Sequence, residues 1–199
     1  MLLPFVEEHR IEAGCDEAGR GCIFGPVVAA SVILPKDFSN KDLNDSKKLS
    51  QKKRDALRIE IEKEAISWSV FEVSHEEIDR INILNASILA MQQAALKLSV
   101  EPDFLLIDGN RFKPFSIPYE CYIKGDGTYR SIAAASVLAK THRDEIMMDF
   151  SLQYPEYKLD KHKGYPTKDH CEAIQRFGYT EFHRKTFHVK SLSQLKLNF

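Results

Sequence analysis

The sequence predicts an α/β protein in which helices flank a mixed central sheet and a helical segment follows towards the C-terminus. Three observations carry this prediction. Short apolar runs typical of strands alternate with longer segments whose apolar residues recur at helical spacing. No repeat, low-complexity run or linker rich in Gly and Ser interrupts them. With 43% hydrophobic residues, a chain of 199 residues is long enough for one compact domain, expected over residues 1–193.

The first half contains three expected strands and one helix. Residues 11–16 (IEAGCD) and 25–34 (GPVVAASVIL) read as two strands that a glycine-rich turn connects. Residues 50–65 are polar with apolar positions at helical spacing, and Ser50 is a suitable N-cap. Apolar and polar residues alternate over 66–74, which predicts a third strand.

The second half is expected to be mostly helical. A continuous helical pattern runs over 75–98 and leads to a short buried strand at 103–108. Residues 119–124 form a fifth expected strand, and residues 131–150, rich in Ala, Leu and Met, predict a strong helix. This order indicates an α/β sandwich with a mixed sheet.

Composition excludes several classes of protein. The longest apolar stretch, 27–34, is far short of the roughly 20 residues that a membrane-spanning helix needs. The start MLLPFVEEHR lacks the pattern of a secretion signal. No C-x-x-C pair occurs among Cys15, Cys22, Cys121 and Cys171, so neither zinc nor disulfides are indicated, and we expect a cytoplasmic protein. The formal charge of −1 argues against a general nucleic-acid coat, although basic residues outnumber acidic ones from Lys140 onward.

Three acids stand where apolar runs end. Asp16 and Asp108 end expected strands, and Asp126 precedes a helix in KGDGTY. The carboxyl ends of strands are where open sheets present ligands. Converging carboxylates repel one another unless a cation lies between them, and a hard divalent cation with oxygen ligands fits this need. The alternative is that each acid closes a turn or caps a helix, because Asp-Gly is common at turns.

Glu17 and the glycines after it need a separate argument. Neighbouring strand residues point to opposite faces, so Glu17 joins the acids only if the strand bends or bulges, which Gly19 and Gly21 allow. The same glycines let a ligand approach the backbone closely, while Arg20 can bind a phosphate bidentately. The alternative is a hairpin turn with a surface arginine.

Taken together, these segments resemble bacterial ribonuclease HII over most of the chain. The resemblance is carried by DEAGRG with GPVVAASVIL, LNDSKKLS, IDGNRF, KGDGTYRSIAAASVLAKTHRD and HKGYPTKDH, in the family's order. It implies an RNase H-like fold and a metal-dependent endonuclease. Such an enzyme cuts the phosphodiester 5′ to a ribonucleotide in duplex DNA or in an RNA–DNA hybrid, leaving a 3′-hydroxyl and a 5′-phosphate. The related type-three ribonuclease usually has an added N-terminal domain and lacks the arginine between the glycines, so type two is preferred.

The resemblance also implies roles for individual residues. The acids of the metal site fall on Asp16, Glu17, Asp108 and Asp126. Two ions of Mg²⁺ or Mn²⁺ would activate a water and stabilise the leaving 3′-oxygen. The ribose-recognition tripeptide falls on Gly19, Arg20 and Gly21, and the sugar-stacking tyrosine falls on Tyr165. The alternative for Tyr165 is a half-buried tyrosine whose hydroxyl finds a partner.

Basic residues in the matching segments are expected to bind the duplex, because cations that neutralise phosphates strengthen nucleic-acid binding. The expected duplex-binding surface comprises Lys47, Lys48, Lys140, Arg143, His183, Arg184 and Lys185. For each of them, the alternative is an ordinary solvated charge. Partners on this view are RNA–DNA hybrids and ribonucleotide-containing DNA, bound by a monomer.

Some positions depart from the family pattern, and two rival functions stay open. Cys22 stands where proline is frequent, Thr141 and His142 stand where Val and Thr are common, and HRKTFHVK is about one residue short. One rival is a junction resolvase or transposase-like nuclease, which needs no ribose sensor; the Gly-Arg-Gly and tyrosine segments argue against it. The other is a catalytically silent nucleic-acid-binding protein, against which the intact acids argue.

The last six residues, QLKLNF, resemble the Q-L-x-L-x-[LF] peptide by which many bacterial replication and repair proteins bind the DNA sliding clamp. The matching positions are Gln194, Leu195, Leu197 and Phe199. A free extended tail can place spaced apolar side chains in a partner's pockets. The alternative is that these side chains fold back onto the body of the protein.

Overall fold

A five-stranded mixed sheet forms the centre of the computed structural model, which describes residues 2–44, 46, 49–189 and 192. Its strands are β1 Glu12–Ala18, β2 Val27–Ile33, β3 Ser67–Val73, β4 Phe104–Asp108 and β5 Tyr119–Tyr122. They lie in the order β3-β2-β1-β4-β5. β1, β2 and β3 are antiparallel neighbours, whereas β4 runs parallel to both β1 and β5. The predicted mixed sheet is confirmed.

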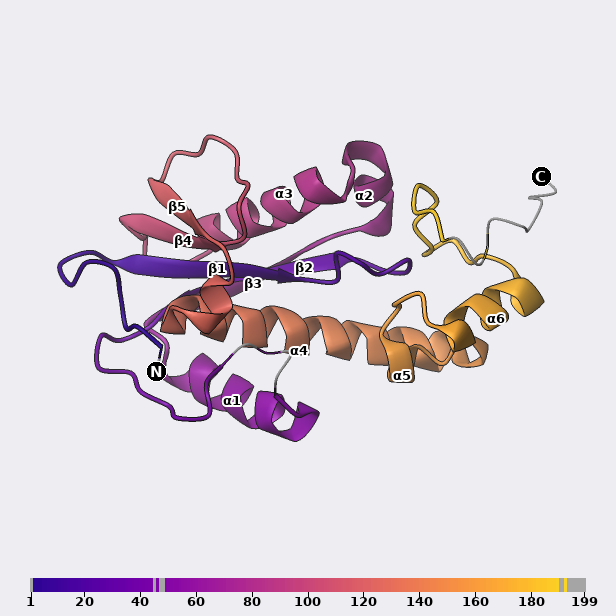
Figure 1. Cartoon of the computed structure of the whole chain (residues 1–199), viewed down its shortest axis with the longest axis horizontal. Helices are drawn as coiled ribbons and strands as arrows, with labels where there is room; N and C mark the ends of the chain where they lie inside the picture. The colour runs from indigo at the N-terminus through magenta and orange to yellow at the C-terminus, as the bar shows by residue number, and fades with distance from the viewer. Residues whose placement is uncertain (1, 45, 47–48, 190–191, 193–199) are drawn as a thin grey trace.

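Helices cover both faces of this sheet (Figure 1). Helices α1 (Gln51–Glu64) and α4 (Arg130–Gln153) pack on one face, and α2 (His75–Ile81) and α3 (Ile83–Leu96) pack on the other. Residues 131–139 of α4 are buried and rich in alanine, so this helix lies very close to β1. Gly14 makes that approach feasible, because a Cβ at this position would collide with the backbone of Ser131. The predicted α/β class with flanking helices is therefore confirmed.

The helix ends show where local sequence signals suffice. Ser50 caps α1 as predicted, its hydroxyl accepting the backbone N–H of Lys53 at 3.4 Å. The single helix predicted over 75–98 is wrong, because Asn82 adopts a φ of 66° and separates α2 from α3. The Asn82 side chain then caps α3 by accepting the N–H of Asn85 at 3.1 Å. Apolar periodicity continues across this break and hides it, although Asn is among the residues that tolerate a positive φ.

The C-terminal helices α5 (Leu159–His162) and α6 (Lys168–Phe177) lie beyond one end of the sheet, along the second half of α4 (Figure 1). We call residues 155–189 the C-terminal module. Its apolar cluster also takes in Phe24 from the β1–β2 connection and Met147 from α4. The connection between the first two strands is therefore packed against the C-terminal module. No helix in the described ranges has the length and apolar content needed to cross a membrane.

Candidate functional site

The predicted acids lie at one end of the sheet, where the inner strands β1 and β4 finish. We call this end of the sheet the acidic edge. β1 and β4 are parallel neighbours, and because Cys15 pairs with Ile107, the next residues, Asp16 and Asp108, lie at the same level. Asp108 also holds the 3-10 turn η2 (Gly125–Gly127): its Oδ1 accepts the N–H of Gly125 at 2.8 Å and that of Asp126 at 3.4 Å. The end of β4 is thus tied directly to the turn that carries Asp126.

Asp16 lies in the most unfavourable environment for a negative charge. Its side chain faces α4 and only 4% of the residue is exposed. Burial raises the pKa of Asp16 well above its usual range, and the charges of Glu17 and Asp108 raise it further. A hydrogen bond with Ser136 of α4 opposes this shift. A carboxylate held in this way is stabilised by a nearby cation, which is the requirement derived from the sequence.

Glu17 reaches the same edge from the other face of β1. Residues from Gly14 to Ala18 pair with β2 in unbroken register, so the bulge considered for Glu17 is not present. Its Oε1 accepts a hydrogen bond from Nη1 of Arg20 at 3.0 Å. Glu17 and Asp16 are adjacent at the end of β1, with their side chains on opposite faces of the strand. Their negative charges are close enough for Glu17 to raise the pKa of Asp16.

The donor chemistry of these residues fits a hard divalent cation. All the donors are carboxylate oxygens, the preferred ligands of Mg²⁺ and Mn²⁺. As the side chains are placed, no three Asp, Glu, His or Cys residues within the described ranges are arranged to hold a metal ion. Arg20 engages Glu17, and backbone amides of the η2 turn engage Asp108. Forming a complete ligand set therefore requires these carboxylates to reorient.

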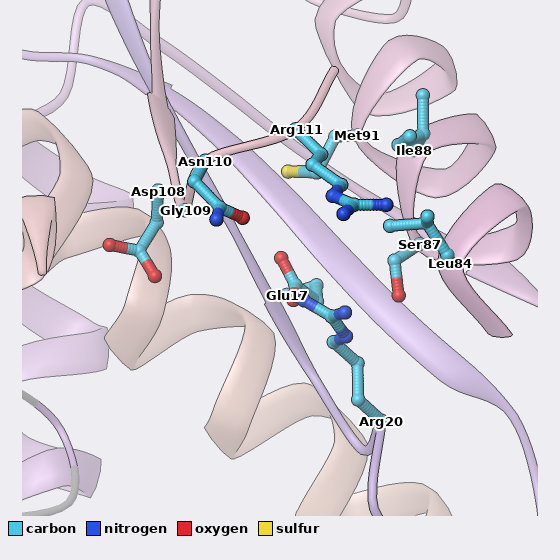
Figure 2. Close-up of a pocket in the computed structure, with 10 residues that line it drawn as sticks. All are labelled: Glu17, Arg20, Leu84, Ser87, Ile88, Met91, Asp108, Gly109, Asn110 and Arg111. Carbon is cyan, nitrogen blue, oxygen red and sulfur yellow. Dashed lines mark hydrogen bonds and ion pairs between the residues drawn. The ribbon is translucent and has the colours of Figure 1, made fainter. Parts of the chain in front are cut away.

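A pocket of about 200 Å³ opens beside Glu17, between the end of β1, the loop after β4 and α3 (Figure 2). The guanidinium groups of Arg20 and Arg111 and the side chain of Ser87 lie around this hollow. The lining comprises Glu17, Arg20, Leu84, Ser87, Ile88, Met91, Asp108, Gly109, Asn110 and Arg111. Sequence reasoning assigned no role to Ser87, Asn110 or Arg111, because nothing in the helical pattern distinguishes Ser87 from other small buried residues.

The Gly19 to Gly21 loop meets Tyr165, although the two are far apart in the sequence. A Cβ added to Gly21 would lie 3.5 Å from Cε1 of the Tyr165 ring. Tyr165 is 42% exposed, so its ring remains accessible to a ligand. Gly19 has a φ of 98°, and a Cβ there would collide with Nε of Arg143. The structure therefore brings together the tripeptide and the tyrosine that were predicted to recognise ribose.

Arg143 was expected on the duplex-binding surface, and that prediction is wrong. Only 1% of the residue is exposed. Its guanidinium donates to the carbonyl oxygens of Pro26 at 3.0 Å, Lys163 at 2.8 Å and Phe24 at 3.2 Å. These bonds tie the β1–β2 connection to the C-terminal module. A guanidinium that is buried and occupied in this way has no access to phosphate.

Arg184 was also expected to contact the substrate, and it is buried to the same extent, with 1% exposed. It donates to the carbonyl oxygens of Gly25 at 2.9 Å, Arg20 at 3.2 Å and Pro26 at 3.0 Å. Burial lowers the pKa of Arg184 to about 10, which leaves it charged at neutral pH. Its role is to hold the loop of Arg20, because its guanidinium joins the carbonyl of Arg20 to those of Gly25 and Pro26.

His183 is a third buried residue for which a duplex contact was wrongly predicted, with 1% exposed. The N–H of Thr180 donates to its Nδ1 at 2.9 Å, so its Nε2–H donates to Nε2 of His170, 3.3 Å away. Nδ1–H of His170 in turn donates to the carbonyl oxygen of Tyr165 at 2.9 Å. Burial lowers the pKa of His170 to about 4 and that of His183 to about 3, so both are neutral at pH 7. His183 and His170, which we call the histidine relay, thus support the segment that carries Tyr165 through a chain of hydrogen bonds.

The other basic residues expected to bind the duplex differ in exposure. Lys185 is exposed, and its backbone N–H donates to Asp79 at 2.8 Å. Lys140 is partly buried and pairs with Asp144. Lys47 and Lys48 lie outside the described residues, as do the tail positions Gln194, Leu195, Leu197 and Phe199.

The departures from the family pattern are accommodated by packing. Cys22 is fully buried, and its thiol lies 3.5 Å from the carbonyl oxygen of Lys163. Thr141 donates to the carbonyl of Val137 within α4, at 2.8 Å. The imidazole Nε2 of His142 lies 3.0 Å from the Glu62 carboxylate of α1. These contacts are structural, which agrees with the expectation that the departures leave the acids untouched.

Comparison with known proteins gives a consistent family. A family model described as "Ribonuclease HII" matches residues 13–190. The protein named "Ribonuclease HII" of Parabacteroides distasonis is 61% identical over 200 residues, covering 100% of both chains. The protein of the same name from Bacteroides thetaiotaomicron is 60% identical, again over 100% of both.

Solved structures give the same fold. The structure of the PCNA:RNase HII complex from Archaeoglobus fulgidus matches with a TM-score of 0.75 and 25% identity, covering 90% of this chain and 96% of that one. The ribonuclease H2 from Pyrococcus horikoshii OT3 matches with a TM-score of 0.74 and 24% identity, over 89% and 93% of the two chains. The structure of Bst-RNase HIII in complex with Mn²⁺ matches with a TM-score of 0.64 and 19% identity, over 84% and 62%. The RNase H-like fold expected from the sequence is confirmed.

Proposed function

The chain belongs to the ribonuclease HII family and is an endoribonuclease that degrades RNA in RNA–DNA hybrids, and from this premise we propose its cleavage site and its products. It hydrolyses the phosphodiester 5′ to a ribonucleotide, both in RNA–DNA hybrids and at ribonucleotides embedded in duplex DNA. The products are a 3′-hydroxyl and a 5′-phosphate. One observation carries this proposal: the carboxylates at the sheet edge adjoin the loop of Gly19 to Gly21, and that loop contacts Tyr165.

Asp16, Glu17, Asp108 and Asp126 are the proposed ligands for two ions of Mg²⁺ or Mn²⁺. When bound, the ions supply an activated water and stabilisation of the leaving 3′-oxygen. The protein contributes the backbone that keeps these acids near one another, because Asp16 lies between β1 and α4 and Asp108 lies next to the η2 turn, and the carboxylates reorient to complete the ligand set. A solved relative of the same fold was determined in complex with Mn²⁺, which supports a divalent metal.

Recognition of ribose is assigned to the backbone of Gly19, Arg20 and Gly21. A 2′-hydroxyl is both a donor and an acceptor, so backbone groups can distinguish ribose from deoxyribose without reading the base. The loop is suited to this task because Arg184 donates to the carbonyl of Arg20 and the Arg143 side chain packs against Gly19. Weak dependence on base sequence is therefore expected.

Tyr165 completes the recognition site. Its exposed ring lies beside Gly21, where it can pack under the sugar on the 3′ side of the cut and favour deoxyribose there. This contact would give the enzyme its preference for a junction between RNA and DNA. The exposed side chain of Lys185, together with Lys47, is assigned to phosphates of the duplex.

The C-terminal peptide is proposed to bind a sliding clamp through Gln194, Leu195, Leu197 and Phe199. A solved RNase HII was determined as a complex with PCNA, which supports a partner of this kind. Tethering would raise the local concentration of the enzyme on DNA. Clamp binding should be lost in a chain that ends at Ser193, and equal binding by both chains would reject the assignment. We further propose that the enzyme acts as a monomer in the cytoplasm.

The test of the proposed function is incubation with Mg²⁺ and a DNA duplex that contains one ribonucleotide. We expect a single cut 5′ to the ribonucleotide, with a 3′-hydroxyl and a 5′-phosphate identified by ligation and end-labelling. An all-DNA duplex should stay intact, and a chelator should abolish cleavage. Cleavage of all-DNA junctions would favour the resolvase-like alternative, and binding without any cleavage would favour the silent binding protein.

A further inference from the structure

The pocket beside Glu17 contains a buried polar group that the proposed catalysis does not use. Ser87 on α3 is 1% exposed, and its hydroxyl has no hydrogen-bond partner among the described residues. Leaving a buried hydroxyl unpaired costs about 1–3 kcal/mol. The group lines the pocket together with the apolar side chains of Ile88 and Met91 (Figure 2). A ligand that enters the pocket can supply the missing partner.

Two guanidinium groups and two carboxylates, those of Glu17 and Asp108, line this hollow, and the arrangement of these charges leaves one guanidinium for an anion. The guanidinium groups of Arg20 and Arg111 both lie at the pocket, with the Ser87 hydroxyl between the two arginine side chains and α3 (Figure 2). Glu17 pairs with Arg20 at 3.0 Å. Within the described residues, no carboxylate forms an ion pair with Arg111. The pocket therefore has one guanidinium that is free to bind an anion bidentately.

The position of the pocket identifies the anion. It begins at Glu17, a proposed metal ligand, and at Arg20, part of the proposed ribose-recognition loop. A strand held at these residues must pass the mouth of the pocket. The volume of about 200 Å³ is several times the roughly 30 Å³ that a water molecule occupies, so a phosphate group fits with accompanying water. The apolar floor suits the C–H edge of a sugar.

We propose that Ser87 and Arg111, together with Arg20, form a subsite for one phosphate of the substrate strand next to the scissile phosphate. Arg111 neutralises the charge, and the Ser87 hydroxyl donates to a phosphate oxygen. Asn110 lies at the rim, where its amide can donate to the same group. This inference rests on the proposed function, because it names how the same site holds the strand that is cut.

The experiment replaces single phosphates around the ribonucleotide with uncharged methylphosphonates. For the wild-type enzyme, a methylphosphonate at one flanking position should raise KM roughly tenfold, as expected for the loss of a charged hydrogen bond. Arg111→Gln should show the raised KM on the unmodified duplex, with kcat little changed, and should no longer respond to methylphosphonate at that one position. Its response at all other positions should stay that of the wild type.

Ser87→Ala separates a ligand role from a structural one. Because the hydroxyl bonds to none of the residues that the structure describes, its removal should leave the melting temperature unchanged or higher, while the response to the same methylphosphonate weakens. Ser131→Ala is the matched control, since Ser131 is another buried serine whose hydroxyl has no partner among the described residues and lies outside the pocket. It should leave KM and the methylphosphonate pattern unchanged.

Binding measured by fluorescence anisotropy, in the presence of Ca²⁺ in place of Mg²⁺, gives a second readout that does not require cleavage. A methylphosphonate at the same single position should weaken binding of the duplex to the wild type but not to Arg111→Gln. If both proteins respond identically at every position, the subsite is rejected. If position-dependent binding is found but no ribonucleotide duplex is cut, the subsite stands and the proposed function fails.

Discussion

The acidic edge and the recognition loop adjoin each other, yet they are built in opposite ways. The acids take their places from backbone: Asp16 and Glu17 from the pairing of β1 with its neighbours, and Asp108 from amides of the η2 turn, which follows the adjacent strand β5. The recognition loop is held by side chains from far along the chain. Arg184, for example, donates to the carbonyl of Arg20, 164 positions earlier in the sequence.

The two regions also differ in how favourable their charges are. Asp16 is buried next to two other acids, so its negative charge destabilises the folded state. A bound cation would offset this destabilisation. Arg143 and Arg184 are buried as well, but their guanidinium groups make six hydrogen bonds to five backbone carbonyls, that of Pro26 being shared. Changes at the acids should therefore reduce activity without reducing stability, whereas changes behind the loop should reduce both.

The largest effect is expected at the acidic edge. Asp16→Asn should lower turnover by about a thousandfold or more, because metal assistance supplies several kcal/mol of transition-state stabilisation. Duplex affinity should be largely retained, since phosphate contacts elsewhere supply much of it. The melting temperature should be unchanged or higher, because a buried like charge is removed. Asp149→Asn, an exposed acid of α4, is the control for kcat and melting. Normal turnover by Asp16→Asn would contradict the metal site.

The next effect concerns the histidine relay behind Tyr165. His170 and His183 titrate in the folded state at about 4 and about 3, below the 6.5 of an unperturbed histidine. The native state therefore binds fewer protons than the unfolded state below pH 6.5. The stability that the two neutral histidines contribute is complete above that pH and is lost as pH falls. Between pH 7 and pH 5 the loss is about 2 kcal/mol of unfolding free energy for each histidine.

Urea unfolding at several pH values measures this slope. His183→Gln should be less stable than the wild type at pH 7 but should lose less stability on acidification, because one titrating group is gone. His9→Gln, at an exposed position, should retain the wild-type slope. A slope that is identical in the wild type and His183→Gln would show that the relay does not control acid stability.

A smaller effect is expected from filling the space behind the recognition loop. Gly19→Ala places a Cβ against Nε of Arg143 at a φ of 98°. Gly178→Ala is the matched control, because its φ is 84° and nothing lies within 4 Å of the new Cβ. Both positions have a positive φ, so an alanine at either one carries backbone strain of about 1–3 kcal/mol. Only Gly19→Ala should add a further loss of about 1–3 kcal/mol by displacing hydrogen bonds of Arg143.

Thermal melting and cleavage kinetics together separate these two glycine variants. Gly19→Ala should also reduce the preference for a ribonucleotide duplex over an all-DNA duplex, whereas Gly178→Ala should leave that preference intact. Equal melting temperatures for the two variants would mean that Arg143 can move aside at no cost, and the loop would then not be held as described.

The smallest effect is expected at the exposed ring. Tyr165→Ala should lower kcat/KM on a single-ribonucleotide duplex roughly tenfold, in line with about 1–3 kcal/mol for a stacked base or sugar. Tyr165→Phe keeps the ring and should retain most of the activity. Because 42% of Tyr165 is exposed, neither change should shift the melting temperature strongly. A wild-type rate for Tyr165→Ala would remove this residue from substrate recognition.

The sequence by itself determined the features that depend on neighbouring residues. Alternating and helical periodicities located the strands and most helices, and Ser50 marked the start of α1 because capping is a local hydrogen bond. The acids were found because strand ends are visible in the sequence as the ends of apolar runs. Asn82 is the local exception, since apolar periodicity extends across the break that its positive φ makes.

The tertiary structure alone decided which charges are buried and which polar groups are left without partners. Arg184 and Lys185 are adjacent in the sequence, yet one is 1% exposed and the other lies on the surface. The difference arises because the carbonyls of Arg20, Gly25 and Pro26 converge behind the recognition loop and need donors there. Ser87 is likewise one small residue in a helical pattern until β1 and β4 place two arginines across from it. Such contacts join distant segments, so no local pattern specifies them.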